Sequence, residues 1–310
     1  MYFTMTRAAV TVAGGVVALC LGSVPAALAS PASSAYFVPC NAYALNEAIY
    51  HANFHNGETL DLAPGCTYDL PHALPIIKTH LTIVGYQTTL TRTWDAGSFS
   101  LLGVGKCTGG GGGITNENSD DPPLCMSDLT VIKVNFTGGG GSDTDEGGAI
   151  FNSGELNVEG GTFSGNNTSE YGGAIYNDGH MTVNNATFTG NVAPYGGAIY
   201  NQDDASIGGS SFTWNKAPNP YGDLDNSDGG SIFNDEDMYL ANSGFVANST
   251  GGNCGAIYTQ DDLHAGRITV VDNAAGFEAG GIYNNDETVT LLDSTVFGNQ
   301  PNNCSNIPAC

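Results

Sequence analysis

Carboxylate side chains recur at one place in this sequence, shortly after an aromatic residue that itself returns about every 25 residues. The recurring acids are Asp178, Asp203, Asp204, Asp235, Asp237, Asp261, Asp262, Asp286 and Glu287. Two carboxyl groups at a suitable separation act as acid and base in glycoside hydrolysis, and Asp203, Asp204, Asp235, Asp261 and Asp262 are the catalytic candidates. Stacked carboxylates also repel one another, and calcium, which binds carboxylate oxygens, would relieve that repulsion. Solvated acidic turns are the third interpretation.

A loop inside the longest repeat carries alternating acids of the kind that bind calcium. It reads Asp223-Leu224-Asp225-Asn226-Ser227-Asp228-Gly229. Asp223, Asp225 and Asp228 would be the metal ligands, but the distal bidentate glutamate of an EF-hand is missing. Calcium is therefore the single candidate cofactor, and solvated turns are the alternative here too.

The aromatic residues themselves form a candidate binding surface for sugars. In the motif Ile150-Phe151-Asn152 and its copies, alternation places the isoleucine on one face and the aromatic ring on the other. With isoleucine inside, the rings stack outside, and a flat row of rings can hold a glycan. The predicted ligand-binding residues are Tyr176, Tyr200, Phe233, Tyr258 and Tyr283. The alternative is ring stacking that only strengthens a sheet.

These residues are positioned by a sequence repeat. A Gly-Gly-Ala-Ile motif and its worn copies place isoleucine at 150, 175, 199, 232, 257 and 282, in steps of 25, 24, 33, 25 and 25. A Phe-x-x-Asn motif follows in the same phase, with an alternating apolar segment between the two. Each unit thus predicts three short strands, which bury their apolar side chains only by stacking. We expect an all-β, right-handed parallel β-helix with coils of 24–25 residues.

Two asparagine columns should stand at corners of this helix. One contains Asn166, Asn191, Asn215, Asn248, Asn273 and Asn299. The other contains Asn152, Asn177, Asn201, Asn234 and Asn284, and Thr259 interrupts it. Stacked amides hydrogen-bond along such columns, so we interpret both as structural.

A short helix should cover the N-terminal end of the β-helix. Leu45, Ala48, Ile49 and Ala52 share one helical face, and Gly57 can end the helix. Glu47, His51 and His55 share another face of this helix. They could bind a metal ion together; the alternative is that they form a solvated surface.

Four segments follow from these patterns. They are a signal peptide at 1–29, a leader and capping helix at 30–57, a β-helix at 58–300 with regular repeats at 128–300, and a tail at 301–310.

The paired Gly-Gly-Ala-Ile and Phe-x-x-Asn motifs resemble the polymorphic outer-membrane-protein repeats of secreted bacterial β-helix proteins. The resemblance covers residues 128–300, and Ala44–Ile49 through Ala63–Tyr68 resembles the N-terminal cap of pectin-lyase-like proteins. The resemblance implies a pectin-lyase-like parallel β-helix fold and an adhesin-like role. The Asn-Thr-Asp, Gly-His-Gly and Arg-Ile-Lys motifs of polygalacturonases are missing, and only Arg267-Ile268-Thr269 remains as a fragment.

Charge and export narrow the function further. Lysine and arginine number 7 against 31 acids, a net charge of −24, which disfavours nucleic acids and anionic membranes because both require basic residues. The apolar run before Ala29 indicates a secretory signal peptide, and no later run is long enough to span a bilayer. Disulfides are then expected for Cys40–Cys66, Cys107–Cys125 and Cys304–Cys310, leaving Cys254 buried and free.

The leading hypothesis is a secreted, monomeric, non-catalytic β-helix that binds a carbohydrate or cell-surface ligand. A polysaccharide lyase or glycoside hydrolase on the same scaffold is the first alternative, and a structural protein of the cell envelope is the second.

Overall fold

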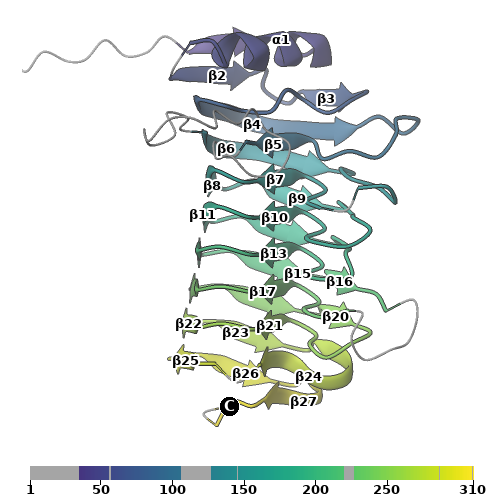
Figure 1. Cartoon of the computed structure of the whole chain (residues 1–310), viewed down its shortest axis with the longest axis vertical. Coiled ribbons are helices and arrows are strands. Elements are labelled where there is room, and N and C mark those ends of the chain that lie inside the picture. The colour runs from purple at the N-terminus through teal and green to yellow at the C-terminus, as the bar shows by residue number, and fades with distance from the viewer. Residues whose placement is uncertain are drawn as a thin grey trace, which may run out of the picture. The chain divides into compact units, whose positions relative to one another are not determined.

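A computed structural model describes residues 35–55, 57–105, 127–144, 146–219, 227–285, 287–308 and 310. These residues form an all-β parallel solenoid of about ten turns with a single short helix near the N-terminus, which confirms the predicted fold class (Figure 1). The predicted signal peptide, Cys107, Cys125, Asp223, Asp225 and Asp286 lie outside the described residues. Within the described ranges, no helix is long and apolar enough to cross a membrane.

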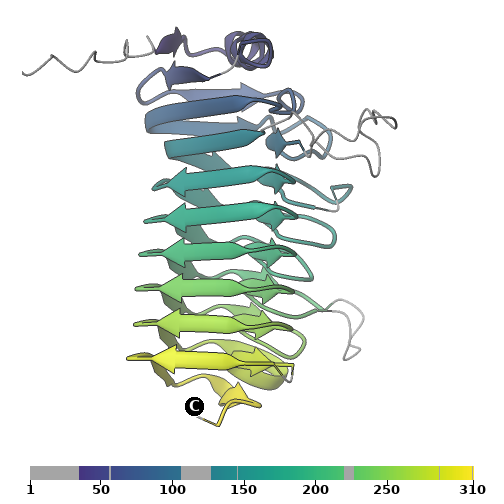
Figure 2. The same cartoon turned by 60° about the vertical axis from the view of Figure 1, so that its left-hand side comes forward.

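Successive turns supply strands to three stacks, in which neighbouring strands run parallel (Figure 2). The first stack is β1 (Tyr36–Val38), β2 (Glu58–Leu62), β4 (His80–Arg92), β6 (Asp128–Thr137), β8 (Glu155–Glu159), β11 (His180–Asn184), β14 (Ala205–Gly208), β18 (Met238–Ala241), β22 (Leu263–Gly266) and β25 (Val289–Leu292).

The long strands β4 and β6 continue into the second stack. Its other members are β3 (Thr67–Leu70), β9 (Thr162–Ser164), β12 (Thr187–Thr189), β15 (Ser211–Thr213), β19 (Gly244–Val246), β23 (Thr269–Val271) and β26 (Thr295–Phe297).

The third stack contains the isoleucine–aromatic motif. It comprises β5 (Leu102–Val104), β7 (Ile150–Asn152), β10 (Ile175–Asn177), β13 (Ile199–Asn201), β17 (Ile232–Asn234), β21 (Ile257–Thr259), β24 (Ala274–Asn284) and β27 (Gln300–Ser305). Two short strands, β16 (Lys216–Ala217) and β20 (Ser249–Thr250), extend the same sheet.

The core is built from the inward side chains of all three stacks. The isoleucines of the third stack are fully buried, as are Phe136, Phe163, Phe188, Phe212 and Phe245 of the second. From Phe136 to Phe245 the phenylalanine rings stack with centroid separations of 4.7–4.9 Å. A single coil has no partner for these faces, so the apolar burial that stabilises the fold exists only between coils.

Both asparagine columns form hydrogen-bonded ladders. In the first, each side-chain amide from Asn166 to Asn273 donates to the carbonyl oxygen of the next asparagine at 2.9–3.0 Å. In the second, the amides of Asn152, Asn177 and Asn201 do the same at 2.6–2.8 Å. Thr259 extends this ladder by one step, because its hydroxyl accepts from Asn234 at 3.0 Å.

Helix α1 (Ala42–Ala52) covers the N-terminal end of the solenoid and buries the four predicted apolar residues. The side chain of Asn41 caps it by accepting from two backbone amides of the first turn. The helix ends at Ala52 and not near Gly57, so the predicted end was wrong. The cause is Asn53, whose side chain donates to the Ile76 carbonyl and accepts from the Lys78 amide in the next coil.

Disulfide bonds close both ends of the described chain. Cys40 is bonded to Cys66 and Cys304 to Cys310, as predicted, and Cys254 is buried with a free thiol. Strand pairing also extends past the boundary expected at residue 300, because β27 pairs with β24.

Removal of one ladder amide should destabilise the whole solenoid. Asn215 is completely buried, and its amide group bonds Asn191, Asn248 and the carbonyl of Phe188. Asn215→Ala leaves buried polar groups unpaired and should lower the unfolding free energy by about 3 kcal/mol. Chemical denaturation measures this. Asn157→Ala, on the outer face of β8, is the control and should change little; equal losses would contradict a special role of the ladder.

Candidate functional site

The predicted aromatic surface is a buried stack. Adjacent rings from Phe151 to Tyr283 lie nearly parallel, with centroids 4.7–5.5 Å apart. The stack lies outside the main core, as expected, in a separate apolar cluster. However, Tyr176, Tyr200 and Tyr258 are each only 8% exposed, and Phe233 is 4% exposed. These four rings are therefore not the outer row that was expected to hold a glycan, and Tyr283 is partly buried in the same cluster.

Two further tyrosines contribute to the burial of Tyr176, Tyr200 and Phe233. Tyr171 contacts the Tyr200 ring edge-on at 4.8 Å, and Tyr195 contacts Phe233 edge-on at 5.7 Å. The rings of Tyr171 and Tyr195 also stack on each other at 5.4 Å. Because each directly precedes a Gly-Gly pair, the sequence contained a signal for a second aromatic layer. The faces that would hold a sugar already hold other rings, so this stack is structural.

The recurring acids gather into groups at one turn of successive coils. Carboxylate oxygens of Asp237, Asp261 and Asp262 lie within 4.8 Å of one another. A second group lies nearer the N-terminus, where the ligand atoms of His180, Asp203 and Asp204 also lie within 4.8 Å of one another. Such oxygen-rich groups have the chemistry that hard cations prefer.

Asp235 stands apart from these groups. Its carboxylate accepts a hydrogen bond from the Tyr200 hydroxyl at 3.4 Å. Burial raises the pKa of Asp235 above its usual value, more than the bond from Tyr200 lowers it. Burial also raises the pKa of Tyr200. The environment of Asp235 thus favours its protonated, acid form.

Asp228, a predicted calcium ligand, is only 6% exposed. One of its carboxylate oxygens accepts from the backbone amide of Asn253 at 2.8 Å. It therefore anchors the backbone of the next coil.

A third group of ligand-type side chains lies at the N-terminal cap. It contains His51, His55 and Glu58, with ligand atoms within 4.8 Å. Glu47, predicted as the third member, is exposed on α1 outside this group. The cause is that the helix ends at Ala52, so His55 follows the turn toward β2 instead of continuing the helical face.

The most exposed aromatic side chains include both tryptophans of the chain. Trp94 is 93% exposed and Trp214 is 70% exposed, whereas tryptophan is usually among the most buried residues. Sequence reasoning missed both. The signal for one was visible: in the motif Phe212-Thr213-Trp214-Asn215, tryptophan stands where three other copies have glycine and two have Ala247 and Asp272.

Trp214 occupies a corner that demands a left-handed backbone. Its φ is +58°, and the equivalent residues Gly165 and Gly190 have φ of +61° and +63°. The left-handed conformation costs an ordinary residue roughly 1–2 kcal/mol and is an outlier for a bulky one. The backbone amide of Trp214 still donates to the next coil, at Val246, as those of Gly165 and Gly190 do at Thr189 and Thr213. The backbone hydrogen bonding of the solenoid is therefore the same with tryptophan as with glycine at this corner, so the fold does not require the tryptophan side chain.

Trp94 lies beyond the same edge of the second stack. Thr91, Thr137, Ser164, Thr189 and Thr213 pair in register along this edge. Trp214 directly follows the last of these residues, and Trp94 comes three residues after the first. The two strands are four coils apart, or about 19 Å at one strand spacing per coil. The Arg92 side chain holds the Trp94 turn by donating to the carbonyls of Ala96 and, in the adjoining coil, Gly138.

In the three coils between the strands that precede the tryptophans, the corner residues have no side chains of their own, and the Arg92 side chain reaches only the first of them. These residues are Gly138, Gly165 and Gly190, and a Cβ added at Gly165 or Gly190 would meet open space. Hydroxyl groups of the second stack flank this strip, and Thr213 donates to Thr189 along it at 3.2 Å. We call the two tryptophans with the three glycines the tryptophan corner.

Comparison of the chain with models of known protein families, with curated proteins and with solved structures finds no match in any of the three. The tryptophan corner and the acidic turns must therefore be interpreted from their own geometry.

The raised pKa of Asp235 predicts a pH-dependent stability change. A carboxyl group whose pKa is higher in the folded state favours folding below its unfolded pKa, and this contribution is lost as pH rises through the folded pKa. Asp235→Asn should therefore raise the melting temperature at pH 7 and leave it unchanged at pH 3. Asp204→Asn, which removes an exposed charge from the same acidic turns, is the control; an equal rise in both variants would contradict the prediction.

Proposed function

We propose that this chain is a secreted, non-catalytic scaffold that binds a glycan chain along the tryptophan corner. The observation that carries the proposal is Trp214, a bulky exposed residue at a left-handed position where the two preceding coils have glycine and the next has the small Ala247. Residues held in unfavourable backbone conformations concentrate at functional sites. Stability alone would favour glycine at this position, so the tryptophan calls for a role outside the fold.

The surface chemistry suits a sugar chain. Tryptophan has a broad apolar face beside one hydrogen-bond donor, which matches the mixed apolar and hydroxyl surface of a sugar ring. The bare corner between the rings leaves room for a chain, and the hydroxyls of Thr137, Ser164 and Thr189 line one side. A ligand lying along the corner would contact both tryptophans, which follow strands about 19 Å apart along the solenoid.

Charge limits the class of glycan. With a net charge of −24, the protein repels polyuronates and sulfated chains. The described disulfides fit an oxidising compartment, as the expected signal peptide does. We therefore propose a neutral polysaccharide of a cell surface or extracellular matrix as the ligand. Kinship with the polymorphic outer-membrane-protein repeats and the pectin-lyase-like proteins is part of this proposal, because those motifs coincide with the coils.

A carbohydrate-active enzyme is the second candidate, and the pKa of Asp235 favours it. Asp235 would be the general acid, and Asp261 in the next coil the partner carboxylate. A reducing-end assay over a panel of polysaccharides tests this. Turnover that disappears in both Asp235→Asn and Asp261→Asn would replace the binding role with a catalytic one.

The binding role is tested by changing Trp214 to the residue that its own repeat prefers. Trp214→Gly should leave the unfolding free energy unchanged or raise it by about 1 kcal/mol, because glycine adopts the left-handed corner freely. The same variant should lose at least tenfold in affinity for a neutral oligosaccharide identified on a glycan array. Calorimetry of binding and thermal melting measure the two effects on one preparation.

Two controls make this test specific. Trp94→Ala should also weaken binding, because both rings contact one ligand. Tyr239→Ala removes a 56% exposed ring from β18 in the first stack and should leave binding intact. Full affinity in the double variant Trp94→Ala, Trp214→Gly would refute the site, and an array without any bound glycan would favour a structural envelope role.

A further inference from the structure

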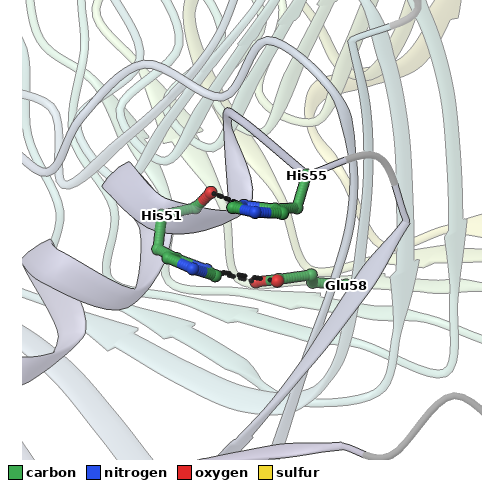
Figure 3. A group of neighbouring side chains, drawn as sticks. All are labelled: His51, His55 and Glu58. Carbon is green, nitrogen blue, oxygen red and sulfur yellow. Dashed lines mark hydrogen bonds and ion pairs between the residues drawn. The ribbon is translucent and has the colours of Figure 1, made fainter.

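A histidine pair and a glutamate converge where the capping helix meets the first coil. His51 lies in the last turn of α1, His55 follows the end of that helix, and Glu58 is the first residue of β2 (Figure 3). The two imidazole rings stack with centroids 4.1 Å apart and planes 14° apart. The Glu58 carboxylate lies beside the His51 ring.

The spacing of these groups matches a small coordination sphere. His51 Nδ1 lies 3.2 Å from Glu58 Oε1. Two ligands bound to zinc at 2.0–2.1 Å in tetrahedral geometry are about 3.4 Å apart. The third ligand atom, from His55, lies within 4.8 Å of the other two. Small side-chain rotations would therefore bring all three onto one ion without moving the backbone of α1 or β2.

The second ring nitrogen of His55 provides independent support. His55 Nδ1 lies 3.1 Å from the carbonyl oxygen of His51, and because a carbonyl only accepts, Nδ1 carries the proton. That tautomer leaves the lone pair on Nε2 for a metal. Histidine ligands in metal sites are oriented in this way, by donating their other N–H to a carbonyl or carboxylate.

We propose that His51, His55 and Glu58 form a site for a divalent transition metal of the zinc class. Two imidazoles and one carboxylate match zinc, copper and nickel, whereas calcium prefers an all-oxygen set. Three protein ligands leave a fourth position open to water, and His51 and His55 are exposed to solvent. The ion would tie the capping helix to the first coil, at the end of the solenoid where unpaired strand edges require cover.

The other ligand-type groups in the described residues differ in chemistry. The group at Asp237 contains only carboxylates, and the group at His180 contains a single imidazole. A zinc-class ion should therefore bind at His51, His55 and Glu58 in preference to the other two groups. This site is independent of the tryptophan corner, so failure of either proposal leaves the other standing.

The test is a metal titration of purified protein that carries no polyhistidine tag. Calorimetry with Zn²⁺ should show one tight site, and Co²⁺ should give the visible absorption of a tetrahedral complex. His55→Ala and Glu58→Gln should each weaken Zn²⁺ binding at least tenfold. A stoichiometric excess of Zn²⁺ should raise the melting temperature of the unaltered protein and not that of His55→Ala.

Matched variants decide the outcome. Glu47→Gln on α1 and His72→Ala, an exposed histidine outside the group, should bind Zn²⁺ normally. His55 is exposed, and its variant should melt as the unaltered protein does when metal is absent. Unchanged Zn²⁺ affinity in His55→Ala, or a loss of the tight site in His180→Ala, would overturn the proposal.

Discussion

Parallel stacking of the coils in one register is the constraint on which this molecule depends. Each coil exposes an apolar face that only its neighbours can bury, and the strands are three to five residues long in most coils. Buried amides at the corners fix the register, because Asn166 and its equivalents bond side chain to side chain and side chain to backbone. A slip of one residue would break the ladder and turn the core side chains outward.

Because the register is the same in successive coils, the residues at each position of the repeat lie in a column along the solenoid. Where the position faces inward, the column is a stack of phenylalanine or isoleucine; where it faces outward, it is a row of hydroxyls, acids or bare glycine. A departure from the repeat is then conspicuous. Trp214 departs at a left-handed corner. Tyr171 and Tyr195 take the position before Gly-Gly that Glu146 and Asp228 hold in the neighbouring coils, and they cover part of the aromatic stack.

The sequence predicted the columns well and their exposure poorly. Periodicity located the isoleucine, phenylalanine and asparagine columns and the helix face of Leu45, because burial and ladder bonding repeat with the coil. It did not predict that the tyrosine faces are buried, since this depends on rings from a different part of each coil packing over them. It also placed Glu47 in the histidine group in place of Glu58, because the end of α1 is set by the bonds of Asn53 to another coil.

The central claim is that the exposed tryptophans of the corner hold a glycan. Both tryptophans of the chain are exposed, so acrylamide quenching of tryptophan fluorescence reports on this surface alone. The account predicts strong quenching of the free protein and protection of both rings when a neutral oligosaccharide is added. Quenching that stays unchanged at saturating concentrations of a glycan shown to bind would contradict the account, because the ligand would then lie elsewhere on the solenoid.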